Sequence, residues 1–410
     1  MRQSLIVLLL AAAIGLAVLP SHASKKQHEA AARVAKPSPQ QAGHAEARLI
    51  EAYQLLAAAQ SLQALEKAEK LVGDFPNFQL AQLLYGDLLA LRKQPVRTLG
   101  DVPGSLSPDS AGNLLALRAE SQARLKALLE RPPPGAIPSE FVSLSARNKH
   151  AIAVDASRSR LYLFENRPQG LALVADYYIS LGKSGVEKAL AGDLRTPLGV
   201  YFITSNLDPK LLSDFYGVGA LPINYPNMLD TKRGKTGNGI WLHGTPPNQF
   251  SRPPRASDGC LVLTNPDLLR LIQTVEINTT PVVISQQLRW VSASQALSDA
   301  KPFQAALSAW TQARALGDMT ALLSHYSQDF DSYGKTLTQW AEQLRAEQGK
   351  ITGSGLELKD LSLVRWTDVN DTMIVTFGQV AGGSRSRPIK RQYWMRQGTQ
   401  WKIFFEGVVK

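Results

Sequence analysis

The 410-residue sequence predicts a multidomain protein with an N-terminal α-helical region, a central β-rich domain and a C-terminal α+β domain. The length corresponds to about three domains of ordinary size. A Pro-rich segment at residues 132–148 divides the chain, because consecutive prolines fit neither a helix interior nor a central strand. The apolar spacing is helical before this segment, strand-like after it, and a mixture of both beyond residue 300.

Residues 1–23 have the pattern of a secretory signal peptide. Arg2 precedes an apolar run from Leu5 to Leu19, and Ser21-His22-Ala23 places small residues where signal peptidase cleaves. The run is shorter than the roughly 20 residues that span a bilayer, so we expect cleavage after Ala23, with an uncleaved membrane anchor as the alternative. The sequence thus predicts a periplasmic protein with no stable membrane span after signal cleavage.

The formal net charge of +11 favours an anionic partner. Nucleic acid is not expected outside the cytoplasm, whereas peptidoglycan stem peptides and anionic wall polymers are present there. A basic surface that serves only solubility is the alternative. The charge therefore narrows the compartment and its partners without identifying a ligand.

Residues 46–131 are predicted to form a helical domain, preceded by a flexible lead at residues 24–45. The punctuation at residues 73–77 predicts a helical hairpin, and a third helix is expected over residues 110–129. The domain could serve packing, positioning or dimerisation, so a homodimer through these helices is one expected assembly. Its apolar residues recur at steps of three and four: Leu49, Tyr53, Leu56, Leu62, Leu65, Ala68, Leu71, Leu80, Leu83, Leu84, Leu88 and Leu91.

The linker at residues 132–148 is followed by the β-rich domain at residues 149–286. Its first two strands are predicted at residues 152–155 and 160–164, joined by Ala156-Ser157-Arg158-Ser159 as in a hairpin. Asn265 and Pro266 are typical of a helix start, which predicts a helix over residues 267–275.

A second linker is expected at residues 287–300, before an α+β domain at residues 301–410. A helix is predicted over residues 303–316, and later strands at residues 356–366, 372–380, 389–396 and 401–406. This helix-then-strand order, with Trp310 in the first helix and an aromatic terminal hairpin, resembles the nuclear transport factor 2-like (NTF2-like) fold. That resemblance implies a curved sheet and helices that enclose a pocket.

Cys260 is the only cysteine of the chain, so in an exported protein it cannot form an internal disulfide. Its best explanation is chemistry, and a nucleophilic thiol needs a base to take its proton. His243 is the natural base, since it precedes Cys260 by only 17 residues. The other histidines are in the signal peptide, the lead, the start of a strand or the last domain: His22, His28, His44, His150 and His325.

The residues around Cys260 and His243 support a catalytic site. In an extended strand, Trp241 and His243 share one face, while Ile240 and Leu242 point to the other. Gly244, Gly259 and the short side chain of Ser257 leave room for a substrate, and the backbone amides of Gly259 and Cys260 could stabilise an oxyanion. Two further zinc ligands are not in evidence nearby, so we expect neither a metal nor a cofactor.

These motifs resemble those of the peptidoglycan L,D-transpeptidase family, which has the YkuD-type catalytic domain. The match consists of His243-Gly244-Thr245, a loop, and Ser257-Asp258-Gly259-Cys260, together with Thr196-Pro197-Leu198-Gly199-Val200-Tyr201 upstream. The resemblance implies that Cys260 attacks the carbonyl at the L-centre of the third residue of a tetrapeptide stem. The terminal D-alanine leaves, and a thioester acyl-enzyme remains.

Two positions depart from the commonest family motif. Asp258 stands where the family has a histidine, and Val262 where it has an arginine. The Asp258 carboxylate would raise the pKa of the neighbouring thiol unless its side chain points away or orients His243. The substrate-binding candidates are therefore taken from elsewhere in the domain: Arg255, Arg252, Arg233, Trp241 and Tyr225.

The sequence thus predicts a periplasmic L,D-transpeptidase acting on peptidoglycan stems. The altered motif and the last domain resemble a three-domain branch that includes cell-shape-determining L,D-carboxypeptidases, so trimming of tetrapeptides to tripeptides is the first alternative. A catalytically decayed wall-binding scaffold is the second. We also expect the β-rich domain to keep its thiol reactivity when the chain ends near Ser298.

Overall fold

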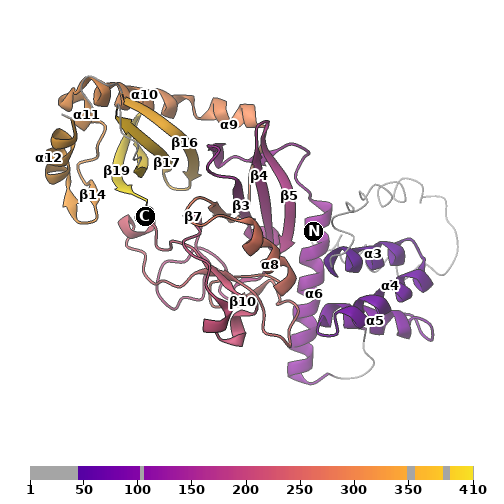
Figure 1. The fold of residues 1–410 in the computed structure, drawn as a ribbon. Helices are drawn as coiled ribbons and strands as arrows, with labels where there is room; N and C mark the ends of the chain where they lie inside the picture. Colours follow the sequence, from indigo (N-terminus) through magenta and orange to yellow (C-terminus); the bar gives the residue numbers. More distant parts are fainter. Residues whose placement is uncertain (1–44, 102–105, 349–355, 382–387, 410) are drawn as a thin grey trace.

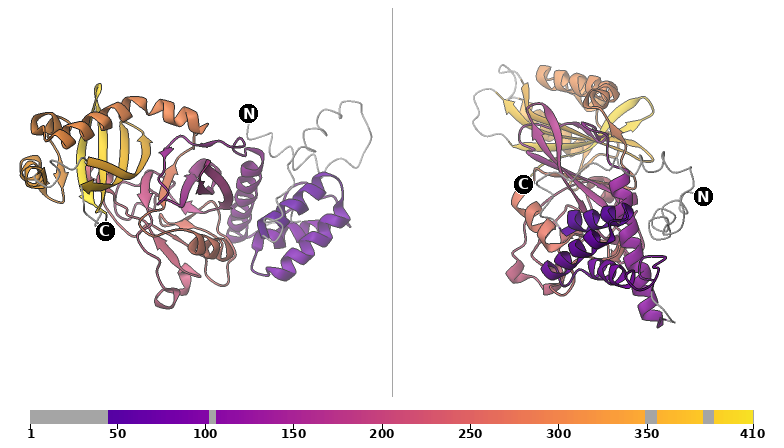
Figure 2. Two further views of the ribbon diagram at one scale, coloured as in Figure 1. Left: turned by 45° about the horizontal axis from the view of Figure 1, so that its top comes forward. Right: turned by 90° about the vertical axis from the view of Figure 1, so that its right-hand side faces the viewer.

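The computed structural model describes residues 45–101, 106–348, 356–381 and 388–409. The signal-peptide and flexible-lead predictions lie outside this range, apart from Ala45. The helical unit (residues 45–129), the central unit (residues 149–286) and the C-terminal unit (residues 301–409) lie in a row, with the central unit in the middle (Figures 1 and 2). The predicted order of fold types is confirmed. Within the described ranges, no helix combines the length and apolarity needed to cross a membrane.

The described part of the helical unit forms four helices, and α6 lies between the other three and the central unit (Figure 1). The apolar run that reads as one helix from Leu49 to Leu71 is two helices, because the chain turns at Ala59, whose φ is +59°. Ser107 caps α6 through a hydrogen bond from the amide of Ser110, with Pro108 in the first turn. The helices are α3 (Ala45–Ala57), α4 (Ser61–Asp74), α5 (Gln79–Ala90) and α6 (Pro108–Leu129).

An ion-pair network joins the helical unit to the central unit. Glu46 of α3 accepts hydrogen bonds from Arg124 of α6, at 2.6 Å, and from Arg160, at 2.9 Å. Burial alone would raise the pKa of Glu46, but Arg160 and Arg124 lower it to about 2. The docking of α3 therefore depends on an ionised carboxylate.

The central unit is built on a five-stranded sheet of order β5-β4-β3-β12-β7, in which only β3 and β12 are parallel. A smaller sheet, β11-β9-β8, packs over it, and an apolar core of Ile152, Leu163, Leu242 and Leu261 fills the space between them. The main strands are β3 (His150–Asp155), β4 (Arg160–Arg167), β5 (Gly170–Tyr178), β7 (Gly199–Phe202) and β12 (Pro281–Ser285).

Short elements around the smaller sheet carry most of the site. The cap of α8 is Thr264, one residue before the Asn265 that the sequence suggested, and its side chain accepts from the amide of Asp267. The elements are β6 (Leu181–Gly182), β8 (Ala220–Pro222), β9 (Trp241–His243), β10 (Arg255–Ser257), β11 (Leu261–Val262), α7 (Met228–Lys232), α8 (Asn265–Thr274) and the 3-10 helices η1 (Ala156–Arg158), η2 (Pro209–Leu211) and η3 (Asp214–Tyr216).

Both segments expected to be linkers contain regular structure. The strand β1 (Ile137–Pro138) pairs with β13 (Trp290–Val291), and α9 (Ala293–Asp299) follows β13. The strand β2 (Phe141–Ser143) pairs with β16 of the C-terminal unit and so extends its sheet. A segment that precedes the central unit in the chain therefore belongs to the sheet of the C-terminal unit.

The C-terminal unit has a sheet of order β19-β18-β17-β16-β2, with helices packed against it. One apolar core lies between α10 and the sheet, and another lies between the sheet and the central unit, where Phe202 and Val200 pack in one cluster with Tyr393 and Ile374. The elements are α10 (Lys301–Leu316), α11 (Met319–Ser324), β14 (Asp331–Ser332), β15 (Lys335–Thr336), α12 (Leu337–Gln348), β16 (Leu356–Thr367), β17 (Asp371–Ala381), β18 (Ile389–Gln397) and β19 (Gln400–Val408).

Candidate active site

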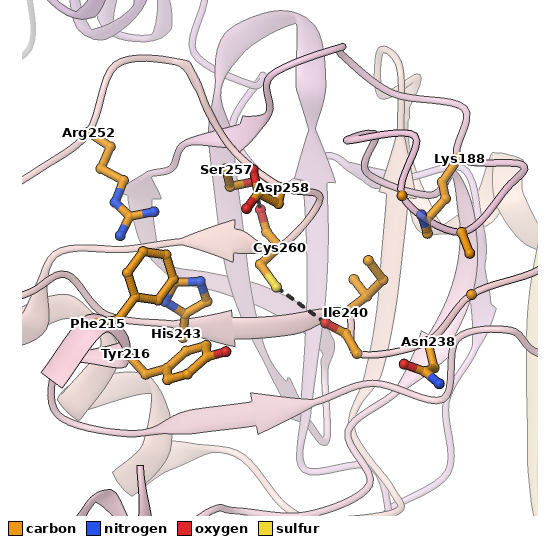
Figure 3. A pocket seen from close by; sticks show the side chains of 14 residues that line it. Lys188, Phe215, Tyr216, Asn238, Ile240, His243, Arg252, Ser257, Asp258 and Cys260 are labelled. Carbon is orange, nitrogen blue, oxygen red and sulfur yellow. Dashed lines mark hydrogen bonds between the residues drawn. The ribbon is translucent and has the colours of Figure 1, made fainter. Parts of the chain in front are cut away.

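A cavity of about 360 Å³ opens around Cys260, and His243 lines it as well (Figure 3). The structure thus brings together the two residues on which the sequence-based chemistry depends. Other predicted residues on its wall are Ser257, Asp258 and Arg252. Those that the sequence analysis missed are Lys188, Ala191, Gly192, Phe215, Tyr216, Gly237, Asn238 and Gly239.

The loop that carries Cys260 is held from both sides. The hydroxyl of Ser257 donates to the carbonyl oxygen of Cys260 at 2.6 Å and accepts from the amide of Gly259 at 3.1 Å. From the other side, the hydroxyl of Thr196 donates to the carbonyl oxygen of Gly259 at 2.9 Å. Gly259 has a φ of +128°, and a Cβ there would lie 2.7 Å from the carbonyl oxygen of Arg195. Ser257 already occupies the Gly259 amide, so the Cys260 amide is the better candidate for an oxyanion donor.

The thiol of Cys260 is half-buried and donates to the carbonyl oxygen of Gly239, with the sulfur 3.4 Å away (Figure 3). Burial raises the pKa of Cys260, the backbone of Trp241 lowers it, Asp258 raises it further, and Arg252 and Lys188 lower it. The net change is upward. The resting nucleophile is therefore a protonated thiol.

His243 ends β9 and is 1% exposed. Its Nδ1 lies 2.7 Å from the carbonyl oxygen of Gly244, which can only accept, so Nδ1 carries the proton and Nε2 is left as the base. Burial lowers the pKa of His243 to about 4, against the opposing effect of the Gly244 hydrogen bond and with a smaller contribution from Arg252. The imidazole is therefore neutral at pH 7.

Aromatic and amide side chains fix the His243 strand. The ring of Tyr216 lies 5.1 Å from that of His243 and 4.9 Å from that of Trp241. Ile240, which was expected on the face opposite His243, also lines the cavity, whereas Trp241 does not. The side chain of Asn265 accepts from the amide of Thr245 at 3.1 Å and donates to its carbonyl oxygen at 2.9 Å. A Cβ on Gly244 would lie 2.1 Å from Asn265 Oδ1, which explains the glycine.

Two cations lie on opposite sides of the cavity (Figure 3). Lys188 donates to the carboxylate of Asp193 at 2.8 Å, so its charge is neutralised. Arg252 is 7% exposed, its guanidinium lies 4.5 Å from the Phe215 ring centroid, and its Nε donates to the side-chain oxygen of Gln249 at 3.3 Å. Arg252 forms no ion pair with any described carboxylate. Its charge is therefore available to a ligand.

The other predicted residues occupy different positions. Asp258 is exposed and its carboxylate accepts from Lys183 at 2.9 Å, so it is directed away from His243. Arg233 is bound through both terminal nitrogens to Asp368 of the C-terminal unit, outside the cavity. Arg255 is exposed on β10 outside the cavity lining.

Tyr225 and Trp241 also lie outside the cavity lining. The hydroxyl of the buried Tyr225 donates to the carbonyl oxygen of Thr236 at 3.1 Å. Trp241 packs on Tyr216. A direct role in substrate binding remains a prediction for both residues, and the geometry gives more support to Arg252.

Comparison with known proteins agrees with the fold and the motifs. Residues 149–284 match the L,D-transpeptidase catalytic domain (YkuD), and residues 302–407 match the Cds6 C-terminal NTF2-like domain. Bd1075 of Bdellovibrio bacteriovorus is 24% identical, with a TM-score of 0.57 over 67% of this chain and 98% of that one. The helical cell shape determining protein Pgp2 of Campylobacter jejuni is 23% identical, with a TM-score of 0.52 over 65% of this chain and 95% of that one. These structures share the fold. A comparison with curated proteins found no match.

Proposed function

We propose that this protein, which carries an L,D-transpeptidase catalytic domain and an NTF2-like domain, is a periplasmic cysteine enzyme that removes the terminal D-alanine from peptidoglycan tetrapeptide stems. The observation that carries the proposal is the cavity itself. A thiol, a neutral imidazole and an arginine that pairs with no carboxylate of the described residues face the same space. Each matches one requirement of acyl transfer from a peptide with a free carboxyl end.

The two neutral groups favour proton transfer during attack. As the sulfur of Cys260 approaches the carbonyl carbon, Nε2 of His243 takes the thiol proton, and an oxyanion forms near the Cys260 amide. The carbon–nitrogen bond then breaks, and His243 returns the proton to the amine of D-alanine. The product of this half-reaction is a thioester on Cys260.

Arg252 is the proposed partner of the carboxylate of the terminal D-alanine. A guanidinium can bind both oxygens of a carboxylate, and partial burial strengthens such a contact. Its place on the cavity wall beside Phe215 sets the orientation of the leaving group relative to Cys260. A stem without a free terminal carboxylate should therefore be a poor substrate.

Water is the proposed acceptor, which makes the protein an L,D-carboxypeptidase. His243 would take a proton from water, the carbon–sulfur bond would break, and the thiolate would be protonated. Transfer needs a second site that holds an amine and limits water. At the two positions where the motif departs from the family, Val262 is apolar and buried and offers no contact to an amine, and the carboxylate of Asp258 is already paired with Lys183.

Transfer to an amine, as in an L,D-transpeptidase, is the second candidate. The exposed carboxylate of Asp258 at the cavity edge favours it, because a carboxylate there could hold the ammonium of an acceptor. A decayed scaffold is less well supported, because the thiol of Cys260 and the imidazole of His243 are both present on the cavity wall.

Incubation of the purified protein with a disaccharide tetrapeptide tests the proposal. Tripeptide and free D-alanine, with no cross-linked dimer even when free stems and glycine are abundant, are the expected products. Cross-linked dimers or stems with an exchanged terminal residue would assign the transferase function instead. No turnover in either assay would contradict both candidates.

A further inference from the structure

The loop that carries Arg252 is attached to the helical unit. Phe250 is buried in the core of that unit, where its ring stacks on Phe78 at 4.3 Å and meets Phe75 edge-on at 5.3 Å. Phe75 and Phe78 flank the turn between α4 and α5. An aromatic side chain of the central unit is thus an integral part of the helical core.

Hydrogen bonds hold the backbone of the same loop. The amide of Phe250 donates to the carbonyl oxygen of Asn77 at 3.2 Å, and the side-chain amide of Asn77 donates to the carbonyl oxygen of Pro247 at 3.0 Å. The hydroxyl of Ser251 donates at 2.7 Å to Glu120, which is buried on α6. Phe250 and Ser251, the two residues before Arg252, therefore both contact the helical unit.

The backbone of Arg252 is connected to α6 through the side chain of Tyr178. The hydroxyl of Tyr178 donates to the carbonyl oxygen of Arg252 at 2.8 Å. The guanidinium of Arg124 lies 3.9 Å from the Tyr178 ring centroid and is bound to Glu120. The backbone of Arg252 thus rests on a tyrosine that the helical unit covers, while its side chain points to the cavity.

We propose that the helical unit completes the substrate site, with Phe250 as the positioning residue that fixes Arg252 beside Cys260. The inference rests on the proposed carboxylate-binding role of Arg252. It assigns the helical unit a part in substrate recognition, among the packing, dimerising and positioning roles that the sequence left open. Arg252 is held close to Cys260 and His243 only while the loop stays docked on the helices.

The test uses the Phe250→Ala variant of the whole protein, with Leu49→Ala as a matched control. Leu49 is fully buried in the same core but lies on α3. We expect Phe250→Ala to raise the KM for a disaccharide tetrapeptide about tenfold with a smaller change in kcat, whereas Leu49→Ala leaves KM within twofold. Phe250→Leu, which keeps an apolar side chain, should restore most of the loss.

A double variant separates positioning from general damage. If Phe250 acts through Arg252, the pair Phe250→Ala and Arg252→Gln should raise KM no further than Arg252→Gln alone. Additive effects would overturn the proposal, as would an unchanged KM in Phe250→Ala. Should Phe250→Ala not fold, Asn77→Ala removes the exposed side-chain bond to Pro247, and a two- to fourfold rise in KM is expected.

Alkylation of Cys260 by iodoacetamide gives a readout that needs no substrate. The charged or titratable groups around the thiol are His243, Asp258, Lys188 and Arg252. Of these, only Arg252 is expected to move in Phe250→Ala. The pH midpoint of alkylation should rise by about half a unit in Phe250→Ala and in Arg252→Gln, and not in Leu49→Ala. A shifted midpoint in a protein without turnover would contradict the proposed function alone. An unshifted midpoint would contradict the positioning role.

Discussion

Cys260 and His243 face one cavity as two neutral groups, and this sets them apart from a preformed thiolate–imidazolium pair. Burial acts on both in the direction that disfavours charge, raising the pKa of the thiol and lowering that of the imidazole to about 4. The proton therefore stays on sulfur until a substrate arrives. This arrangement protects a lone thiol from oxidation, because the thiolate is the reactive form.

The pH profile of kcat/KM should reflect this state. The base form of His243 persists above its pKa of about 4, so the rate at pH 5.5 should lie within about twofold of that at pH 7.5. A histidine with the ordinary pKa near 6.5 would make the rate fall about tenfold over the same interval.

His243→Ala should fold normally and lose roughly two to four orders of magnitude in turnover. Near-normal turnover of this variant would exclude His243 as the base.

The identity of the nucleophile can be checked by covalent capture. The family resemblance implies that a carbapenem acylates the catalytic cysteine, so intact-mass measurement should show one adduct on the wild-type protein. Cys260→Ala should show none, and His243→Ala should show slower labelling. An adduct that survives Cys260→Ala would contradict the assignment.

At the scale of elements, the contact of α3 with the sheet depends on charge as well as on apolar packing. Glu46 lies between Arg124 and Arg160, and Arg160 is also paired with Asp176 of β5. The carboxylate gains from these two arginines more than it loses by burial. Removal of one member of such a group leaves the others buried and uncompensated.

Acid should therefore weaken the contact of the helical unit with the central unit. The pKa of Glu46 is lowered from 4.5 to about 2, so its stabilisation is complete above pH 5 and is lost as the pH falls towards 2. Glu46→Gln should lower the melting temperature at pH 7 and show a weaker dependence on pH below 5. Glu51→Gln on the same helix removes only an exposed pair with Lys67 and is the control. If the melting temperatures of the wild type, Glu46→Gln and Glu51→Gln depended equally on pH, Glu46 would not be the source of the acid sensitivity.

Sequence patterns predicted the elements and site residues that depend on neighbouring residues in the chain. The hairpin pattern of β3 and β4 and the short spacing of His243 from Cys260 predicted the central unit and two of the residues that line its cavity. The division between α3 and α4 was missed because Ala58, Ala59 and Gln60 carry no Gly or Pro signal. The sequence also did not identify the arginine that reaches the cavity. Arg233 and Arg252 look alike in sequence, and only tertiary packing places one on Asp368 and the other beside Phe215.

At the scale of the whole molecule, the central and C-terminal units share a core. Phe202 of β7 and Val364 of β16 belong to one apolar cluster, and Arg233 is bound to Asp368 across the boundary. The sequence-based expectation that Cys260 keeps its reactivity in a chain that ends near Ser298 conflicts with this packing. Truncation would expose the shared apolar face and remove the partner of β2.

The two units should therefore unfold together. Calorimetry of the whole protein is expected to show one transition for the central and C-terminal units, with the helical unit either joining it or melting first. A chain ending near Ser298 should aggregate or melt at least 10 °C lower, since loss of several buried apolar side chains costs several kcal/mol. A stable truncated protein with normal carbapenem labelling would support separable units instead.

The pairing of β2 with β16 also sets an order of events during folding. Ser145, just after β2, bonds to Ser362 of β16, and 217 positions separate them in the chain. Everything between the two must emerge before this edge of the sheet can close, and long-range pairing of this kind is slow. A prematurely terminated chain would carry Cys260 but leave the sheet open and exposed to proteases. A chain that lacks its last strands therefore cannot bury the apolar surface of this sheet, whatever the state of the residues around Cys260.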